Sequence, residues 1–132
     1  MESLVSKMRI SVLWFFVVVS DLANVLMSLA YPGVMEELMT AGESMGPELM
    51  FAGAIVILIP LVMAVLTLTL KDSMNRWLNI ILGLVFTVIY FGNFVELSTT
   101  MPAAYILLLS IAGFIAPALI VWYAWKWPKQ EA

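Results

Sequence analysis

The chain is 132 residues long, with 64% hydrophobic residues, 11% charged residues and a formal net charge of −3. Soluble domains carry roughly 25% charged residues, and so small a domain could not bury this much apolar surface, so the composition predicts a membrane protein. The absence of histidine and cysteine excludes disulfides, zinc and iron–sulfur sites and histidine acid–base chemistry. We expect no cofactor and no metal, and without a basic patch we expect no nucleic-acid partner.

Four segments of the chain are long and apolar enough to cross a bilayer, which takes about 20 residues of helix. They cover about residues 10–30, 49–70, 77–95 and 103–125, separated by polar or helix-breaking stretches. The first segment is longer than the apolar core of roughly 7–15 residues in secretory signals, and it carries Asp21, so we expect a retained helix. Residues 1–132 are therefore predicted to form a single integral membrane domain, an all-α bundle of four transmembrane helices.

The loop after the first segment is predicted to form a short interfacial helix on the outer membrane surface. In residues 33–48, GVMEELMTAGESMGPE, apolar residues recur four apart and acidic residues lie between them. Pro32 suits the first turn of this helix and Gly42 suits its end. We expect a lid that covers the top of the bundle; a gate or a docking element is the alternative.

The basic residues predict how the four helices are oriented. All six lie before the first segment, between the second and third, or after the fourth: Lys7, Arg9, Lys71, Arg76, Lys126 and Lys129. With four crossings, these places share one side of the membrane. The positive-inside rule then places both termini in the cytoplasm, in a multi-pass protein of the cell membrane. Trp14 and Trp77, near the inner ends of their segments, are expected at the headgroups.

The stretch VVVSDLANVL, residues 17–26, places a carboxylate inside the first segment. At about 1.5 Å per residue, Asp21 lies roughly 16 Å from the start of the segment, near the centre of a hydrocarbon layer about 30 Å thick. Insertion scales assign about 2.5–3.5 kcal/mol to an aspartate at that depth. We therefore expect Asp21 to face the bundle interior and to bind a proton or cation, or to anchor a ligand.

Two stripes of polar residues occupy the outer half of the predicted bundle. Asn24 and Ser28 lie on the same helical face as Asp21. The third segment carries a second stripe at matching depths: Thr87, Tyr90, Asn93 and Glu96. If the two helices face each other, the stripes enclose a polar pocket that opens outward, with Glu96 at its mouth. The alternative is a buried network that fixes helix register.

Small and helix-breaking residues inside the segments predict close packing and bends. Four glycines are expected to let helices approach closely: Gly53, Gly83, Gly92 and Gly113. Pro60 in the second segment and Pro117 in the fourth each free a carbonyl and bend their helix. Bent or broken helices line binding sites in many transporters; a role in packing alone is the alternative.

The chain resembles a group of small four-span membrane proteins of bacteria and archaea whose function is unknown. The resemblance rests on three motifs, LWFFVVVSDLANVL, NRWLNIILG and LIVWYAWKWP, and covers all four segments in order. It implies the four-helix architecture and supplies no reaction and no catalytic residue. Asp21 also occupies a place loosely similar to that of the membrane-embedded glutamate of small multidrug exporters, but the residues around it do not match that family.

The expected function is the binding or transport of a small molecule, lipid or ion through the outward polar pocket. The ligand-binding residues would be Asp21, Asn24, Tyr90, Asn93 and Glu96. The alternative is a structural or accessory subunit, in which polar residues hold helix register and lipid-facing surfaces bind another membrane protein. An enzyme would need Asp21, Glu96 and Tyr90 for acid–base work, and no motif supports it. A homo-oligomer is compatible with either role.

Overall fold

The computed structural model describes residues 2–127, and within that range the chain forms five α-helices and no strand. The helices are α1 Glu2–Ser28, α2 Val34–Ser44, α3 Pro47–Thr69, α4 Asp72–Thr100 and α5 Ala104–Trp125. Four of them, α1, α3, α4 and α5, are long and apolar enough to cross a membrane. Each overlaps one predicted segment, but α1 begins eight residues earlier than its segment and α4 extends five residues beyond its segment at each end. The predicted class, a four-helix membrane bundle with a short additional helix after the first span, is confirmed.

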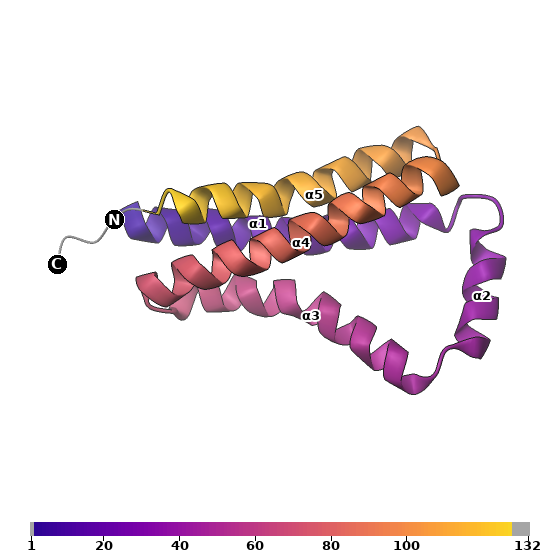
Figure 1. Cartoon of the computed structure of the whole chain (residues 1–132), viewed down its shortest axis with the longest axis horizontal. Helices are drawn as coiled ribbons and strands as arrows, with labels where there is room; N and C mark the ends of the chain where they lie inside the picture. The colour runs from indigo at the N-terminus through magenta and orange to yellow at the C-terminus, as the bar shows by residue number, and fades with distance from the viewer. Residues whose placement is uncertain (1, 128–132) are drawn as a thin grey trace.

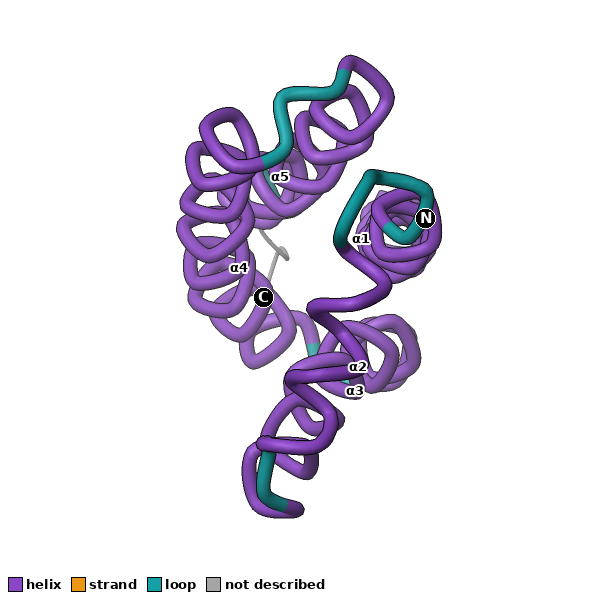
Figure 2. Tube along the Cα trace, turned by 90° about the vertical axis from the view of Figure 1, so that its right-hand side faces the viewer, coloured by secondary structure: helices purple, strands orange, loops and turns teal. Residues whose placement is uncertain are grey.

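The four long helices pack in the order α1–α5–α4–α3, and α3 closes this ring only weakly against α4. Figure 1 shows α1, α4 and α5 running alongside one another, and Figure 2 shows the ring viewed along the bundle. α1 and α4 are therefore diagonal neighbours, whose side chains meet across the centre. Trp14 of α1 packs edge-on against Phe86 of α4, with 5.7 Å between ring centroids. The polar stripes of α1 and α4 consequently face the same interior.

Within residues 2–127, the basic side chains belong to segments that meet at one end of the bundle, which we call the basic end. The start of α1, the α3–α4 turn and the end of α5 lie there (Figure 1). Lys7 and Asp72 form an ion pair across this end, with 3.1 Å between Nζ and Oδ1, and Ser3 donates a 2.8 Å hydrogen bond to the same carboxylate. The opposite end carries α2 and the α4–α5 turn, and we call it the α2 end. Lys129 lies outside the described residues.

Buried polar side chains connect three helices in the half of the bundle nearer the basic end. Trp14 Nε1 donates to Asn79 Oδ1 at 2.6 Å, and Asn79 Nδ2 donates to Asn75 Oδ1 at 2.6 Å. Asn75 Nδ2 donates in turn to the backbone carbonyl of Thr67 on α3 at 2.6 Å. All four residues are fully buried, and we call them the inner network. Because its bonds join α1, α3 and α4, the inner network holds these helices in one register.

The predicted headgroup position of Trp14 is wrong. Its side chain is 0% exposed, whereas Trp77 is 55% exposed, as suits a ring at the membrane surface. The difference has a physical reason: a buried indole N–H needs an acceptor, and Asn79 supplies one to Trp14 alone. Trp14 therefore belongs to the core of the bundle and Trp77 to its surface.

Of the four glycines expected to bring helices together, only Gly83 does so. A Cβ atom there would lie 2.7 Å from Val121 Cγ2 and 3.3 Å from the carbonyl oxygen of Pro117, so α4 and α5 approach closely. At the other three glycines nothing lies within 4 Å of such an atom: Gly53, Gly92 and Gly113. For those three the prediction was wrong, because a small residue makes a close contact only where the packing order places a backbone opposite it.

The half of α3 nearer the α2 end departs from the bundle. Residues 51–58 are all exposed, and the buried residues of this helix begin at Pro60 and continue with Met63 and Thr67. Proline removes a backbone hydrogen bond and bends a helix at that point. Figure 1 shows the helix leading away from α1 and α4 toward α2. This divergence leaves an opening beside the polar stripes.

α2 differs from the prediction in its bounds and in its relation to the bundle. It covers Val34–Ser44, two residues later than expected at each end, and Gly33 precedes it with a left-handed φ of 88° that glycine adopts without strain. None of its residues is buried. It runs across the α2 end from α1 to α3 (Figure 1). α2 therefore does not cover the bundle in the manner of the predicted lid.

Candidate functional site

A cavity of about 370 Å³ lies in the α2-end half of the bundle, between α1, α3 and α4. Its polar lining residues are Asp21, Asn24, Ser28, Tyr90 and Asn93. Its apolar lining residues are Val25, Val34, Val56, Ile89 and Leu97. We call this the outer cavity. Its size falls within the range of small-molecule sites, roughly 300–1,000 Å³.

Helical spacing brings the polar residues to one place. Asp21, Asn24 and Ser28 are three and four residues apart, so they project from one face of α1. Tyr90 and Asn93 are three apart on α4 and project from one face of that helix in the same way. Because α1 and α4 are diagonal in the ring, both faces point to the centre of the bundle. The outer cavity forms there because the half of α3 that precedes Pro60, which would otherwise fill the space, leads away from the bundle.

The amide of Asn24 is held in one orientation. Asn24 is 7% exposed, and its Nδ2 donates to Ser110 Oγ on α5 at 3.0 Å. The hydroxyl proton of Ser110 is already used on the carbonyl of Ile106, at 2.9 Å, so Ser110 can only accept from Asn24. The amide oxygen therefore points away from Ser110, and Asn24 Oδ1 is buried without a hydrogen-bond partner among residues 2–127. A hydrogen-bond donor brought to this oxygen would be stabilising, since an unpaired buried acceptor costs about 1–3 kcal/mol.

Asp21 is the acidic residue of the outer cavity. Its side chain is partly buried, and within the described part of the chain it makes neither a hydrogen bond nor an ion pair. No lysine or arginine is among the residues that line the cavity. An ionised Asp21 would therefore have no compensating cation among the residues that line the cavity.

Tyr90 and Asn93 form the α4 wall of the outer cavity, and both are partly buried. The ring of Tyr90 packs against Phe86, with 5.8 Å between ring centroids. Phe86 in turn contacts Trp14. These buried aromatic rings close the bundle below the cavity, on the side of the basic end.

Four of the five predicted site residues therefore line one cavity: Asp21, Asn24, Tyr90 and Asn93. Glu96 does not line it; the residue is exposed on a different face of α4, since Leu97, one residue further along the helix, does line the cavity. Thr87, which shares the predicted stripe, donates instead to the carbonyl of Gly83 in its own helix, at 2.6 Å. Among the residues that the structure describes, no group of three or more acidic side chains comes together that could hold a metal ion.

Sequence reasoning missed the walls that α2 and α3 contribute. Val34 comes from the first turn of α2 and Val56 from the diverging half of α3. Valine in an apolar segment carries no signal that distinguishes a cavity wall from a lipid-facing position. Only the bend at Pro60 indicated that the second segment could leave the bundle.

Comparison with known protein families matches residues 4–132 to a family of unknown function, DUF6326. The chain belongs to this family. No curated protein and no solved structure matches the chain. The resemblance to small four-span membrane proteins of unknown function is thus confirmed, and membership of DUF6326 assigns no substrate. What the protein does has to be argued from the outer cavity.

Proposed function

We propose that the protein binds a small amphiphilic cation, such as a protonated alkylamine, in the outer cavity. The observation that carries this proposal is the position of Asp21. Asp21 places a carboxyl group in a cavity that no basic residue lines. Within residues 2–127 this carboxyl group has no hydrogen-bond or ion-pair partner. A cation of matching size would supply the missing charge. Ionisable residues at this depth in a membrane helix are usually functional.

The remaining lining residues suit the two ends of such a ligand. Asn24 and Asn93 offer amide oxygens that accept hydrogen bonds from an ammonium group. The ring of Tyr90 offers a face to a cation, an interaction of about 0.5–2 kcal/mol depending on solvation. The apolar residues of the cavity, among them Val25 and Ile89, would contact the hydrocarbon part.

The inner network argues against a purely structural role for Asp21. Trp14, Asn75 and Asn79 already join α1, α3 and α4 by buried hydrogen bonds. Asp21 adds no hydrogen bond to this scaffold within the described residues. A register pin would be expected to make such bonds, whereas a binding residue keeps its acceptor atoms for the ligand.

Binding, rather than passage across the membrane, fits the conformation at hand. The buried rings of Phe86 and Trp14 lie between the outer cavity and the basic end. Transport would require this layer to open. We therefore propose a binding function first and transport as an extension that depends on a second conformation.

We also propose that the basic end faces the cytoplasm of a protein of the cell membrane. The basic residues cluster where α1 begins, at the α3–α4 turn and where α5 ends, which is the distribution that the positive-inside rule describes. The outer cavity then opens on the external half of the bilayer. Its ligand would arrive from outside the cell or from the outer leaflet.

The test is calorimetric titration of the purified protein in detergent with alkylammonium ions of four to eight carbons, and with the matching neutral alcohols. We expect binding of the ammonium ions and at least tenfold weaker binding to Asp21→Asn, because a charge-assisted hydrogen bond contributes about 1.5–3 kcal/mol. Glu96→Gln is the matched control, since it removes a carboxylate of the same end outside the cavity, and its affinity should equal that of wild type. Equal affinity for ammonium ions and alcohols, or equal losses in both variants, would rule the proposal out.

A second candidate, an accessory subunit, is favoured by the exposed half of α3. Residues 51–58 of this helix contact no other part of the bundle closely enough to be buried, and most of them are large and apolar. Another membrane protein, or a second copy of this chain, could pack there. Purification in a mild detergent separates the two candidates, because an accessory subunit should bring a stoichiometric partner with it.

A further inference from the structure

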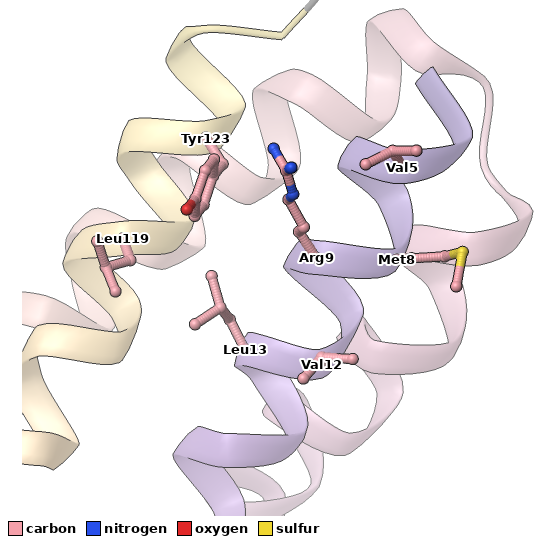
Figure 3. A pocket seen from close by; sticks show the side chains of 7 residues that line it. All are labelled: Val5, Met8, Arg9, Val12, Leu13, Leu119 and Tyr123. Atoms are coloured by element: carbon pink, nitrogen blue, oxygen red, sulfur yellow. The ribbon is translucent and has the colours of Figure 1, made fainter. Parts of the chain in front are cut away.

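A second hollow lies at the basic end, on the outside of the bundle between α1 and α5, with a volume of about 480 Å³. Val5, Met8 and Val12 of α1 form one apolar side, and Leu13 and Leu119 lie between the two helices (Figure 3). We call it the α1–α5 groove. It shares no lining residue with the outer cavity, so occupation of one does not depend on the other.

Arg9 is the cation of this groove. Its guanidinium lies 5.7 Å from the centroid of the Tyr123 ring, on the opposite wall (Figure 3). Within residues 2–127 it has no carboxylate partner, whereas Lys7, two residues earlier, is paired with Asp72. No acidic residue lines the groove. The groove thus combines one uncompensated positive charge with walls that are otherwise apolar.

We infer that the α1–α5 groove binds an anionic phospholipid, with the phosphate at Arg9 and part of an acyl chain along the groove. Arg9 directly precedes the apolar run that begins at Ile10, which places its charge at the level of the lipid headgroups. From Arg9 the groove continues toward the membrane interior past Val12 and Leu13 of α1, a rise of roughly 6 Å, with Leu119 of α5 on the other side. These apolar walls suit the first part of a hydrocarbon chain and offer nothing to a free phosphate ion beyond a single cation.

The charge pattern also favours an anionic over a zwitterionic lipid. A zwitterionic headgroup brings a positive group close to Arg9, and no carboxylate in the groove would compensate it. A basic residue near the membrane surface contributes about 1 kcal/mol to the attraction of anionic lipid, which corresponds to a preference of roughly fivefold. Tyr123 keeps the guanidinium over the groove in the absence of lipid, so little ordering is needed on binding.

The test is native mass spectrometry of the protein released from micelles that contain equal amounts of phosphatidylglycerol and phosphatidylcholine. We expect wild type to retain phosphatidylglycerol at least fivefold in preference. Arg9→Gln should abolish this preference, and Arg9→Lys, which keeps the charge, should retain most of it. Lys126→Gln is the matched control, because it removes a positive charge at the same end outside the groove, and it should behave as wild type.

Filling the groove gives a second, independent readout. Leu119→Trp should lower phosphatidylglycerol retention without any change of charge. Inorganic phosphate, added as a competitor at millimolar concentration, should not displace the lipid. The inference is overturned if Arg9→Gln and Lys126→Gln reduce retention equally, which would indicate general surface attraction. It is equally overturned if phosphate competes, or if Leu119→Trp retains lipid as wild type does.

Discussion

Replacing Asn79 by leucine removes the residue at which the hydrogen bonds of the inner network meet. Asn79 accepts from Trp14 Nε1 at 2.6 Å and donates to Asn75 Oδ1 at 2.6 Å. Leucine has the same branched shape but no polar atom, so Trp14 Nε1 and Asn75 Oδ1 would both stay buried without their Asn79 partner. An unpaired buried group costs about 1–3 kcal/mol, but polar contacts in membrane proteins lie at the low end, averaging about 0.6 kcal/mol. We therefore expect Asn79→Leu to lower the free energy of unfolding by about 2 kcal/mol.

Reversible unfolding in mixed micelles of dodecyl maltoside and sodium dodecyl sulfate, followed by circular dichroism, measures this loss. Trp14→Phe keeps an aromatic ring against Phe86 but removes the indole donor, and it should cost about 1 kcal/mol. In the double variant the indole N–H that Asn79→Leu would orphan no longer exists. The free-energy cost of the double variant should therefore be about 1 kcal/mol smaller than the sum of the two single-variant costs, as expected for residues in direct contact.

Thr87→Val is the control for this series. Thr87 lies on the same helix, but its hydroxyl bonds only to the carbonyl of Gly83 one turn earlier, so its loss should change stability by less than about 0.5 kcal/mol. The reasoning is refuted if Asn79→Leu is no less stable than this control. It is also refuted if the costs of Asn79→Leu and Trp14→Phe simply add.

Two further predictions concern packing and orientation. In the same unfolding assay Gly83→Ala should cost about 1–3 kcal/mol, because the added methyl group would overlap Val121. Gly92→Ala is the control and should leave stability nearly unchanged, because nothing lies within 4 Å of a Cβ atom there. Similar costs for the two variants would contradict the close approach of α4 and α5. Single cysteines in this cysteine-free chain test orientation: in intact cells a membrane-impermeant maleimide should label Gly42→Cys in α2 and not Ser73→Cys at the α3–α4 turn, and the reverse pattern would invert the topology.

Sequence reasoning came close to the outer cavity because helical periodicity is a local property. The spacing of Asp21, Asn24 and Tyr90, Asn93 fixes which side chains share a face of α1 or α4, whatever the helices pack against. The cost of exposing such groups to lipid then directs both faces inward. For the same reason the four spans, read from apolar length, each overlap one of α1, α3, α4 and α5.

The inner network could not be inferred in the same way. Asn75 and Asn79 follow a polar turn, where amides normally meet water or headgroups, and Thr67 is one hydroxyl in an apolar run. Only the packing of all four long helices, which places α1 diagonally opposite α4 with α3 beside them, brings Trp14 to Asn79 and encloses these residues. Which polar residue is a partner, and which is surface, depends on contacts between residues far apart in the chain.

By itself, then, the sequence determined the class of the protein, its spans and the faces that its polar residues share, since each follows from local composition and the 3.6-residue helical repeat. The tertiary structure alone decided that α1 and α4 lie diagonally, that α3 diverges at Pro60 to leave the outer cavity, and that Glu96 lies outside it. These features depend on which helices touch. The pairing of helices depends on many weak contacts between segments that are distant in the chain, and a local sequence pattern does not predict it.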